Sequence, residues 1–186
     1  MRIISGKFKG KSINFLKNLN TRPLKDSVKE NIFNIIKHSK LIPVKIEKAN
    51  VLDLYSGVGS FGLECISRGA DYVTFIEENI EAINKLKENV LKLSVINQTK
   101  LVNKKIENLS FLENEKKYDI LFFDPPFADK KFIQNLVTLK KSKIFKKRHL
   151  IIIHRERGSE DHYENILDLI ILKQYRRSKI IFGSFT

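Results

Sequence analysis

Residues 51–62 read VLDLYSGVGSFG, an apolar run followed by a glycine-rich loop. The run over residues 49–55 has the length and character of a buried strand. The glycines after it let the backbone turn closely into a helix that ends near Gly69. Because open α/β sheets bind ligands where strands end, this stretch predicts an α/β fold with a ligand at the loop.

Strand and helix patterns alternate on both sides of this stretch. The predicted strands are 49–55, 72–76, 100–103, 119–123 and 150–153, with helices at 79–93, 129–140 and, shorter, near 107–112. Two last strands, 167–173 and 179–185, are typical of a hairpin. Repeated β-α units predict an open, mostly parallel seven-stranded sheet with helices on both faces. The hairpin should add an antiparallel strand at or near one edge.

Residues 1–25 form a basic, glycine-punctuated arm, which we expect to precede a globular domain over residues 26–186. Apolar residues alternate with cations, and Gly6 and Gly10 are natural turn points. This pattern predicts a small β-hairpin whose cations bind phosphates without reading sequence, or else a solvated edge hairpin. The cations are Arg2, Lys7, Lys9 and Lys11. Arg22, in the turn that ends the arm, could contact cofactor or RNA.

The first predicted helix follows the arm. Ser27 and Glu30 have the spacing of a capping box, which would start a helix that ends near His38. The lysine-rich stretch 140–148 is interpreted as the solvated end of a later helix, with RNA contact as the alternative. Arg176 and Arg177, between the last two strands, could contact RNA phosphates or belong to a solvated turn.

Composition points to one soluble domain with a nucleic-acid partner. The 186 residues are 42% hydrophobic and 30% charged, with a net charge of +14. Such a surplus favours a polyanion, although an AT-rich genome also raises lysine content. No apolar run approaches the roughly 18 residues that span a bilayer, and the first residues lack a secretory pattern. With a single cysteine, Cys65, we expect a cytoplasmic protein without disulfides or membrane contact.

The histidines show no metal-ligand spacing, so we expect no metal and give them surface or structural roles. They are His38, His149, His154 and His162.

A carboxylate follows the second strand of the predicted sheet. Glu77 lies 20 residues after Gly57, the spacing at which an acid binds a ribose diol. Residues 57–62 also match G-x-G-x-x-G, the dinucleotide fingerprint. However, Asp53 would lie near a pyrophosphate and repel it. S-adenosylmethionine carries an ammonium and a sulfonium instead, and both are attracted to acids.

The strand at 119–123 ends in Asp124-Pro125-Pro126-Phe127. The prolines fix their φ angles and donate no hydrogen bond, so this corner is stiff and its carbonyls are acceptors. With a carboxylate and a flat ring beside them, the corner suits a planar ring that bears an amine. The alternative is a proline pair that only ends a strand.

Several of these stretches resemble known families. Residues 53–64, DLYSGVGSFGLE, resemble motif I of Rossmann-like S-adenosylmethionine methyltransferases. DPPF at 124–127 resembles the [DNS]-P-P-[YFW] motif of amino-methyltransferases. RIISG at 2–6, KGK at 9–11, TRP at 21–23 and SRGA at 67–70 are similar to the RsmD-like family of bacterial 16S rRNA guanine-N2 methyltransferases. The resemblance covers almost the whole chain.

This resemblance implies a class I methyltransferase, a monomer, that acts on 16S rRNA in a 30S subunit or an assembly intermediate. Asp124 and the Pro125 carbonyl would accept hydrogen bonds from the amine while Phe127 stacks on the flipped base. S-adenosylmethionine would be bound by Asp53, Tyr55, Gly57, Gly59, Glu77, Asn103 and Asp124. One departure concerns the adenine contact, because Lys105 stands where the family often has an acid or Asn.

Three alternatives remain open at this stage. An N6-adenine methyltransferase on DNA or RNA would use the same corner, and its product would distinguish it. A non-catalytic RNA-binding or assembly protein on this scaffold would not bind S-adenosylmethionine. An NAD-dependent oxidoreductase is disfavoured by Asp53 and by the proline corner.

Overall fold

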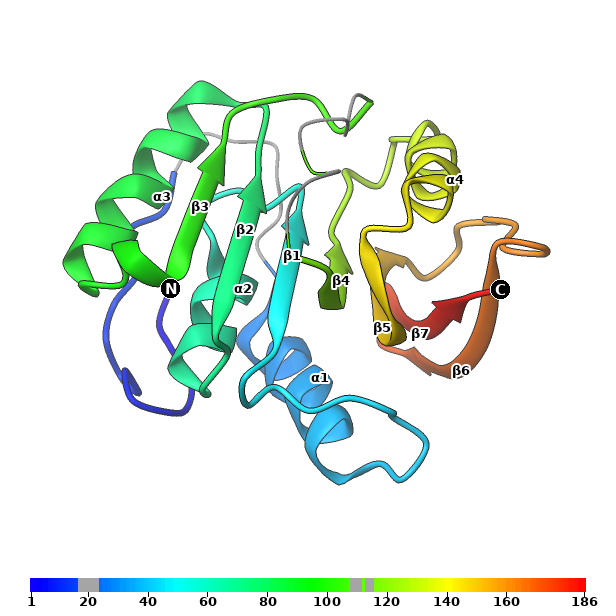
Figure 1. The fold of residues 1–186 in the computed structure, drawn as a ribbon, viewed down its shortest axis with the longest axis horizontal. Coiled ribbons are helices and arrows are strands. Elements are labelled where there is room, and N and C mark those ends of the chain that lie inside the picture. Colours follow the sequence, from blue (N-terminus) through cyan, green and yellow to red (C-terminus); the bar gives the residue numbers. More distant parts are fainter. Residues whose placement is uncertain (17–23, 108–111, 113–115) are drawn as a thin grey trace.

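Seven strands form one sheet in the order β3-β2-β1-β4-β5-β7-β6 (Figure 1). The computed structural model describes residues 1–16, 24–107, 112 and 116–186. The strands are β1 (Asn50–Leu54), β2 (Tyr72–Ile76), β3 (Thr99–Val102), β4 (Tyr118–Phe123), β5 (Phe145–Glu156), β6 (Leu167–Gln174) and β7 (Ser178–Phe185). Neighbours from β3 to β5 are parallel, and β7 is antiparallel to both β5 and β6. The predicted mostly parallel sheet with a closing hairpin is therefore confirmed.

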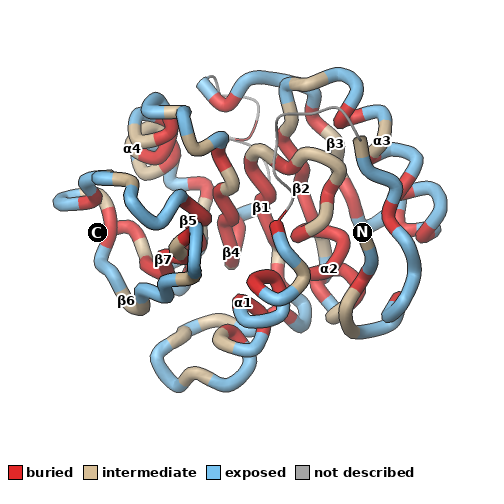
Figure 2. Tube along the Cα trace, turned by 180° about the vertical axis from the view of Figure 1, so that it is seen from behind, coloured by how far each residue is buried: buried red, intermediate tan, exposed pale blue. Residues whose placement is uncertain are grey.

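Helices cover both faces of the sheet, as predicted. The helices are α1 (Asp26–His38), α2 (Ser60–Ser67), α3 (Ile80–Lys92) and α4 (Phe132–Ser142), with a 3₁₀ turn at Ile96–Gln98. Apolar residues of α1, α2 and α3 share one core with Val51, whereas those of α4 share the other with Leu52 and Leu54. Figure 2 shows α1 and α2 in front of the buried strands. Within the described ranges, no helix is long and apolar enough to cross a bilayer.

One strand begins earlier than the sequence indicates. β5 starts at Phe145 rather than residue 150, so Lys146 to Arg148 belong to a strand and not to a helix end. Phe145 packs against Phe185 with ring centroids 4.8 Å apart, and an irregularity in the pairing with β4 accommodates the exposed cations. The short helix expected near residues 107–112 lies mostly outside the described residues.

The capping box is a wrong prediction. α1 begins at Asp26, one residue before Ser27, and Lys25 at its N-cap makes no side-chain cap bond. Lys29 N–H donates to Lys25 O at 2.9 Å, and the Asp26 carboxylate lies 3.8 Å from Lys29 Nζ. This ion pair favours a start one residue earlier than a serine cap would give.

The amino-terminal arm turns at Gly6 and Gly10, as expected, and folds back on itself as a short antiparallel hairpin, with Ile3 N–H donating to Lys11 O and Ile13 N–H to Met1 O, each at 2.9 Å. Its only β pairing among the described residues is the bridge between Arg2 and Ser12. The backbone donors between these paired segments are used on α2. Phe8 N–H, for example, donates to Ser67 Oγ at 2.9 Å. A Cβ on Gly6 would come within 1.8 Å of Ser67 O, so only glycine allows this approach.

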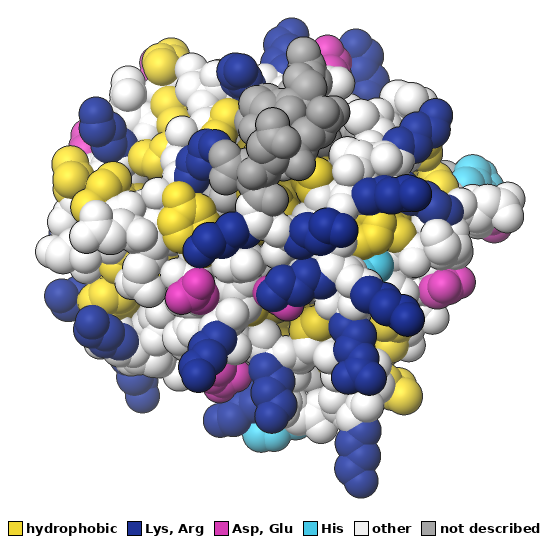
Figure 3. Space-filling view, in the orientation of Figure 1, with side chains coloured by type: hydrophobic (Ala, Val, Ile, Leu, Met, Phe, Trp, Pro, Cys, Tyr) yellow, Lys and Arg dark blue, Asp and Glu magenta, His cyan; other side chains and the backbone are white. Residues whose placement is uncertain are grey.

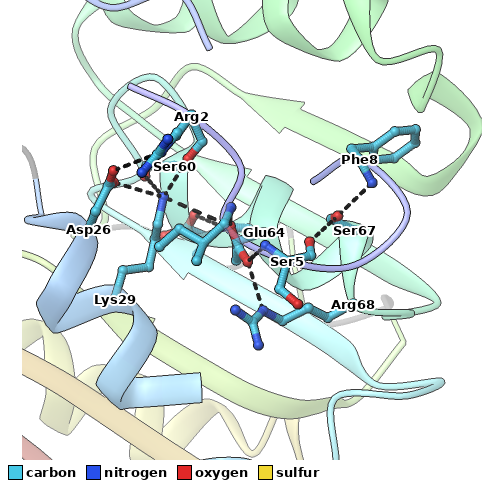
Figure 4. A network of polar contacts seen from close by, with 12 residues as sticks. Arg2, Ser5, Phe8, Asp26, Lys29, Ser60, Glu64, Ser67 and Arg68 are labelled. Atoms are coloured by element: carbon cyan, nitrogen blue, oxygen red, sulfur yellow. Dashed lines mark hydrogen bonds and ion pairs between the residues drawn. The ribbon is translucent and has the colours of Figure 1, made fainter. Parts of the chain in front are cut away.

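Glu64 connects the arm to two helices (Figure 4). Its fully buried carboxylate accepts from Ile4 N–H at 2.8 Å and Ser5 N–H at 2.9 Å. It also accepts from Arg68 Nε at 2.7 Å and lies 3.9 Å from Lys29 Nζ. Burial lowers the pKa of Lys29, and the Glu64 carboxylate opposes that shift. The arm is therefore part of the packed core rather than a separate appendage.

Replacing Glu64 by Ala should destabilise the protein strongly. The change leaves two arm N–H groups without their acceptor and removes the buried negative charge beside the Lys29 ammonium, which keeps its bonds to Arg2 O and Ser60 Oγ. Removing one partner of a buried pair costs about 3–5 kcal/mol, measured here as the free energy of unfolding in urea. Glu88→Ala, which removes an exposed carboxylate paired with Lys85, is the control and should change little. Equal losses in the two variants would contradict this role of Glu64.

Candidate functional site

A cavity of about 820 Å³ opens where β1, β2 and β4 end. Parallel strands place their carboxyl ends on one edge of the sheet, and the cavity lies at that edge. Seven predicted site residues line it: Asp53, Tyr55, Gly57, Glu77, Asp124, Pro125 and Phe127. The fold thus brings the predicted cofactor loop and the predicted catalytic corner to one place.

The glycine loop forms the floor between β1 and α2. Gly57 has a φ of 53° and donates its N–H to Glu77 Oε2 at 2.7 Å. Gly59 lies outside the cavity and caps α2 with a φ of 85°, where a Cβ would come within 2.3 Å of Leu86 Cδ1. Between strand and glycines, Ser56 Oγ is buried, lines the cavity and has no hydrogen-bond partner in the part of the chain that the structure describes. That hydroxyl is positioned for a ligand.

Two carboxylates of the cavity are held by backbone amides. Asp53 is almost completely buried and accepts from Gly62 N–H at 2.9 Å. Burial raises the pKa of Asp53 well above its usual range, and the Asp124 and Glu77 carboxylates add to the shift. Glu77 accepts from Gly57 and from Asn79, and burial raises its pKa as well. Both acids would be stabilised as anions by a cationic ligand.

The corner after β4 is paired with a histidine of β5. Asp124 Oδ1 lies 2.7 Å from His154 Nδ1, and the His154 ring meets Phe127 edge-on at 5.6 Å. Pro125 is buried and lines the cavity, and its carbonyl has no donor among the described residues. The second oxygen of Asp124 is likewise without a protein partner there. Two acceptors of the corner are thus open toward a ligand.

Arg155 occupies the other acceptors of the corner. It donates to Pro126 O at 3.0 Å and to Phe127 O at 3.3 Å. The guanidinium is almost fully buried, forks onto Asp161 at 3.0 and 3.2 Å, and stacks on Phe132 at 4.2 Å. The planar fork of arginine suits this arrangement, which holds two successive carbonyls and a carboxylate together.

Tyr55 connects the glycine loop to the segment after the corner. Its hydroxyl lies 3.1 Å from Asp129 Oδ2 and accepts from Asn135 Nδ2 at 2.9 Å. Burial raises the pKa of Tyr55, so the neutral phenol donates to Asp129. Its φ of 57° is rare for a residue with a side chain, which indicates that these contacts hold the backbone there.

Asn103 is placed differently from its prediction. It is absent from the cavity lining, and its side-chain amide donates to Glu77 O at 2.9 Å and Glu78 O at 3.0 Å. It therefore holds the turn that carries Glu77. Lys104 and Lys105 line the cavity beside it.

The cations of the arm lie outside the cavity, although Met1 lines it. Arg2, Lys7, Lys9 and Lys11 are exposed. The Lys7 amide donates to Ser67 O at the last residue of α2, roughly 12 Å along the helix from its cavity end. Arg22 lies outside the described residues. Figure 3 shows that lysine and arginine side chains far outnumber acids on the face drawn.

The whole chain is similar to known proteins. The family described as Conserved hypothetical protein 95 matches residues 1–183. The chain belongs to this family. A ribosomal RNA small subunit methyltransferase D from Buchnera aphidicola subsp. Baizongia pistaciae is 33% identical, over 100% of the chain and 91% of that relative. The namesake from Haemophilus influenzae is 34% identical over 84% and 79%.

The solved structures agree with these relatives. A putative methyltransferase, yhhF, from Escherichia coli superimposes with a TM-score of 0.82 at 26% identity, covering 100% of the chain and 97% of that structure. The RsmD-like resemblance and the Rossmann-like methyltransferase fold, both inferred from the sequence, are therefore confirmed.

Sequence reasoning missed three residues of this site. Ser56 was passed over between two predicted ligands, and His154 and Arg155 were not connected with the corner. His154 and Arg155 follow the apolar core of β5 at its carboxyl end, on the edge of the sheet where the other site residues lie. The rule that selected Asp53, Glu77 and Asp124 could have selected them too. Instead, the absence of metal-ligand spacing removed His154 from consideration.

Because the pKa of Asp53 is raised, replacing this residue by Asn should make the ligand-free protein more stable at neutral pH. Below pH 4 the residue is protonated in both folded and unfolded states. As pH rises toward the raised folded pKa, the unfolded chain releases its proton first, so wild-type stability falls. Asp53→Asn cannot titrate, and its melting temperature should exceed the wild-type value by a few degrees at neutral pH.

Thermal melting of the ligand-free protein from pH 4 to 8 measures this difference. The gap between Asp53→Asn and wild type should widen as pH rises and close near pH 4. The exposed carboxylate of Asp71 provides the control Asp71→Asn, which should show no such gap. A gap independent of pH would mean that Asp53 is not responsible.

Proposed function

We propose that the protein is an S-adenosylmethionine-dependent methyltransferase that methylates the exocyclic N2 amine of a guanine in 16S rRNA. The observation that carries the proposal is the pair of open acceptors, on Asp124 and Pro125, at the wall of an acid-lined cavity. Membership of the family and relatives named as ribosomal RNA small subunit methyltransferases support it. We further propose a monomer that acts on a 30S subunit or an assembly intermediate.

The cavity fits a cationic nucleoside cofactor. Among the described residues, the buried hydroxyl of Ser56 has no hydrogen-bond partner, and the buried acids Asp53 and Glu77 have no cation paired to them. S-adenosylmethionine supplies a methyl group that its sulfonium activates, together with a ribose diol and an ammonium. Glu77 would bind the diol, while Asp53 and Ser56 would hold the amino-acid part.

The corner would make the guanine amine reactive by accepting hydrogen bonds from its two N–H groups. The amine lone pair is delocalised into the ring, so a planar nitrogen is a poor nucleophile. Asp124 and the Pro125 carbonyl favour a tetrahedral, increasingly positive nitrogen, which is the geometry of attack. Phe127 offers a ring on which the flipped base stacks. The nitrogen then loses a proton to Asp124 or to water.

His154 is assigned here as a positioning residue for Asp124. Its Nδ1 lies 2.7 Å from Oδ1 of Asp124, so the bond fixes the carboxylate and leaves Oδ2 for the amine. The ring also meets Phe127 edge-on, which orients the stacking surface. His154 thus acts on both groups that would hold the base.

Two substitutions separate catalysis from cofactor binding. Asp124→Ala should lower kcat by about 10²–10³-fold or more while S-adenosylmethionine still binds, because the corner serves the amine. Glu77→Ala should instead raise the dissociation constant of S-adenosylmethionine about 10- to 100-fold, since it removes a charged acceptor. Calorimetry measures binding, and methyl transfer to rRNA from a strain lacking this gene measures turnover.

Nucleoside mass spectrometry of the same reaction identifies the product. N2-methylguanosine is expected, and N6-methyladenosine would overturn the guanine assignment. A wild-type protein that binds S-adenosylmethionine but never methylates rRNA would overturn the proposed substrate. Near-normal turnover by Asp124→Ala would remove the corner from the mechanism.

The hydrogen bond from His154 should matter for turnover but not for the cofactor. His154→Ala should lower kcat about 10- to 100-fold, the value of a hydrogen bond to a charged group. Asn can place an amide donor near the position of Nδ1, so His154→Asn should recover part of this loss. Equal activity of the two variants would show that the bond to Asp124 is not what His154 contributes.

A further inference from the structure

A second hollow, of about 620 Å³, lies on the far side of Phe127. Phe127 is the one residue that lines both this hollow and the cofactor cavity among the residues described. The remaining lining is polar and includes three arginines: Glu156, Arg157, Gly158, Gln174, Arg176 and Arg177. None of the three arginines has a role in the site described above.

The hollow is a product of the closing hairpin. Glu156 at the end of β5 pairs with Ser178 at the start of β7, so the turn after β5 lies against the turn between β6 and β7. Arg157 N–H donates to Arg177 O at 3.1 Å, which joins the two turns directly. The turn itself is closed by Tyr175 N–H on Ser178 O at 2.7 Å. Backbone bonds therefore hold the arginines beside the corner.

The arginines of the hollow are exposed, and no acidic side chain among the described residues is paired with their positive charges. Within the described ranges, the guanidinium groups of Arg157, Arg176 and Arg177 make no hydrogen bond or ion pair, and the one carboxylate in the lining is Glu156. Arg155, two residues before Arg157, is the opposite case. It is buried and fully used by Asp161 and two carbonyls. Arg155 therefore has a structural role, whereas the three exposed arginines are available to bind a partner.

We propose that this hollow binds RNA backbone phosphate next to the methylated nucleotide. The proposal rests on the proposed function. A base stacked on Phe127 and held by Asp124 leaves its sugar and flanking phosphates outside the cofactor cavity, on the Phe127 side. Guanidinium groups bind phosphate oxygens through paired N–H donors. Gln174, with an amide donor and acceptor, suits a ribose 2′-hydroxyl there.

The hollow complements the amino-terminal arm. Lys7 contacts the residue that ends α2, at the end of the helix away from the cavity, so the cations near the turn of the arm would meet RNA at a distance from the reacting base. The arginine hollow adjoins Phe127 directly. It therefore positions the target nucleotide itself, whereas the arm adds attraction elsewhere along the RNA.

The double variant Arg176→Ala/Arg177→Ala tests this assignment. Both side chains are exposed and lie in a turn whose bonds are made by backbone groups, so the fold and S-adenosylmethionine affinity should persist. The KM for RNA should rise about tenfold, and the slope of log affinity against log salt should fall by about one. Lys40→Ala/Lys45→Ala removes two exposed cations from the loop before β1, at the opposite edge of the sheet, and is the charge-matched control.

The comparison between the two double variants decides the matter. Unchanged KM and salt slope in Arg176→Ala/Arg177→Ala, or equal changes in both double variants, would overturn the hollow as a phosphate site. Wild-type methyl transfer to rRNA is measured first in the same assay. If it fails, the proposed function fails. If it succeeds while the arginine variant matches the wild type, only the present inference fails.

Discussion

The parallel pairing of β2, β1 and β4 forces three carboxylates to the same edge of the sheet. Leu54, the last residue of β1, pairs with the last residues of both neighbouring strands, so Glu77 and Asp124 follow on either side of it. Asp53 lies one residue before and is buried. When carboxylates lie close together and are partly desolvated, each raises the free-energy cost of ionising the others. The donors that reach Asp53 and Glu77 are backbone amides, which relieve that cost without cancelling the charge.

This arrangement explains why an acid-rich cavity can persist in a protein with a net charge of +14. A lysine paired to Asp53 would neutralise it permanently and compete with a cationic cofactor. Neutral N–H groups from Gly57, Gly62 and Asn79 leave the cavity electrostatically unsatisfied. Stability is given up at a functional site in favour of binding, a common exchange in proteins. Lysines do line the cavity, among them Lys104 and Lys105, but within the described residues none of them forms an ion pair with Asp53 or Glu77.

The selectivity of the corner comes from which acceptors the protein itself consumes. The Asp124 carboxylate and the backbone carbonyls of Pro125, Pro126 and Phe127 lie close together in the sequence, and an amine could bind to these acceptors in several competing arrangements. Arg155 takes the carbonyls of Pro126 and Phe127, and His154 takes one oxygen of Asp124. What is left is one carboxylate oxygen and the Pro125 carbonyl. His154 and Arg155 of β5 thus leave the stiff proline turn with two free acceptors, which match the two N–H groups of an amine.

The sequence was most informative where one local rule suffices. Strand and helix order followed from periodicity, and Asp53, Glu77 and Asp124 followed from their positions at strand ends. It failed where partners are distant: Asn103 holds a neighbouring turn, and Glu64 collects donors from the arm 59 and 60 residues away. The hairpin of the arm could be predicted from its glycines, but its attachment to α2 could not, because no pattern within residues 1–25 reveals the acceptors on Glu64 and Ser67.

Phe127 lies at the boundary between the two electrostatic halves of the site. On one side are the carboxylates that favour a cation, and on the other are arginines that favour phosphate. A nucleotide is itself divided in this way, with a neutral amine-bearing base and an anionic backbone. In the proposed complex, Phe127 would lie between the base, on the side of the cavity, and the sugar-phosphate backbone, on the side of the hollow. Because the cavity is partly buried and the hollow is open, salt would screen the contact with the backbone more than the contact with the cofactor.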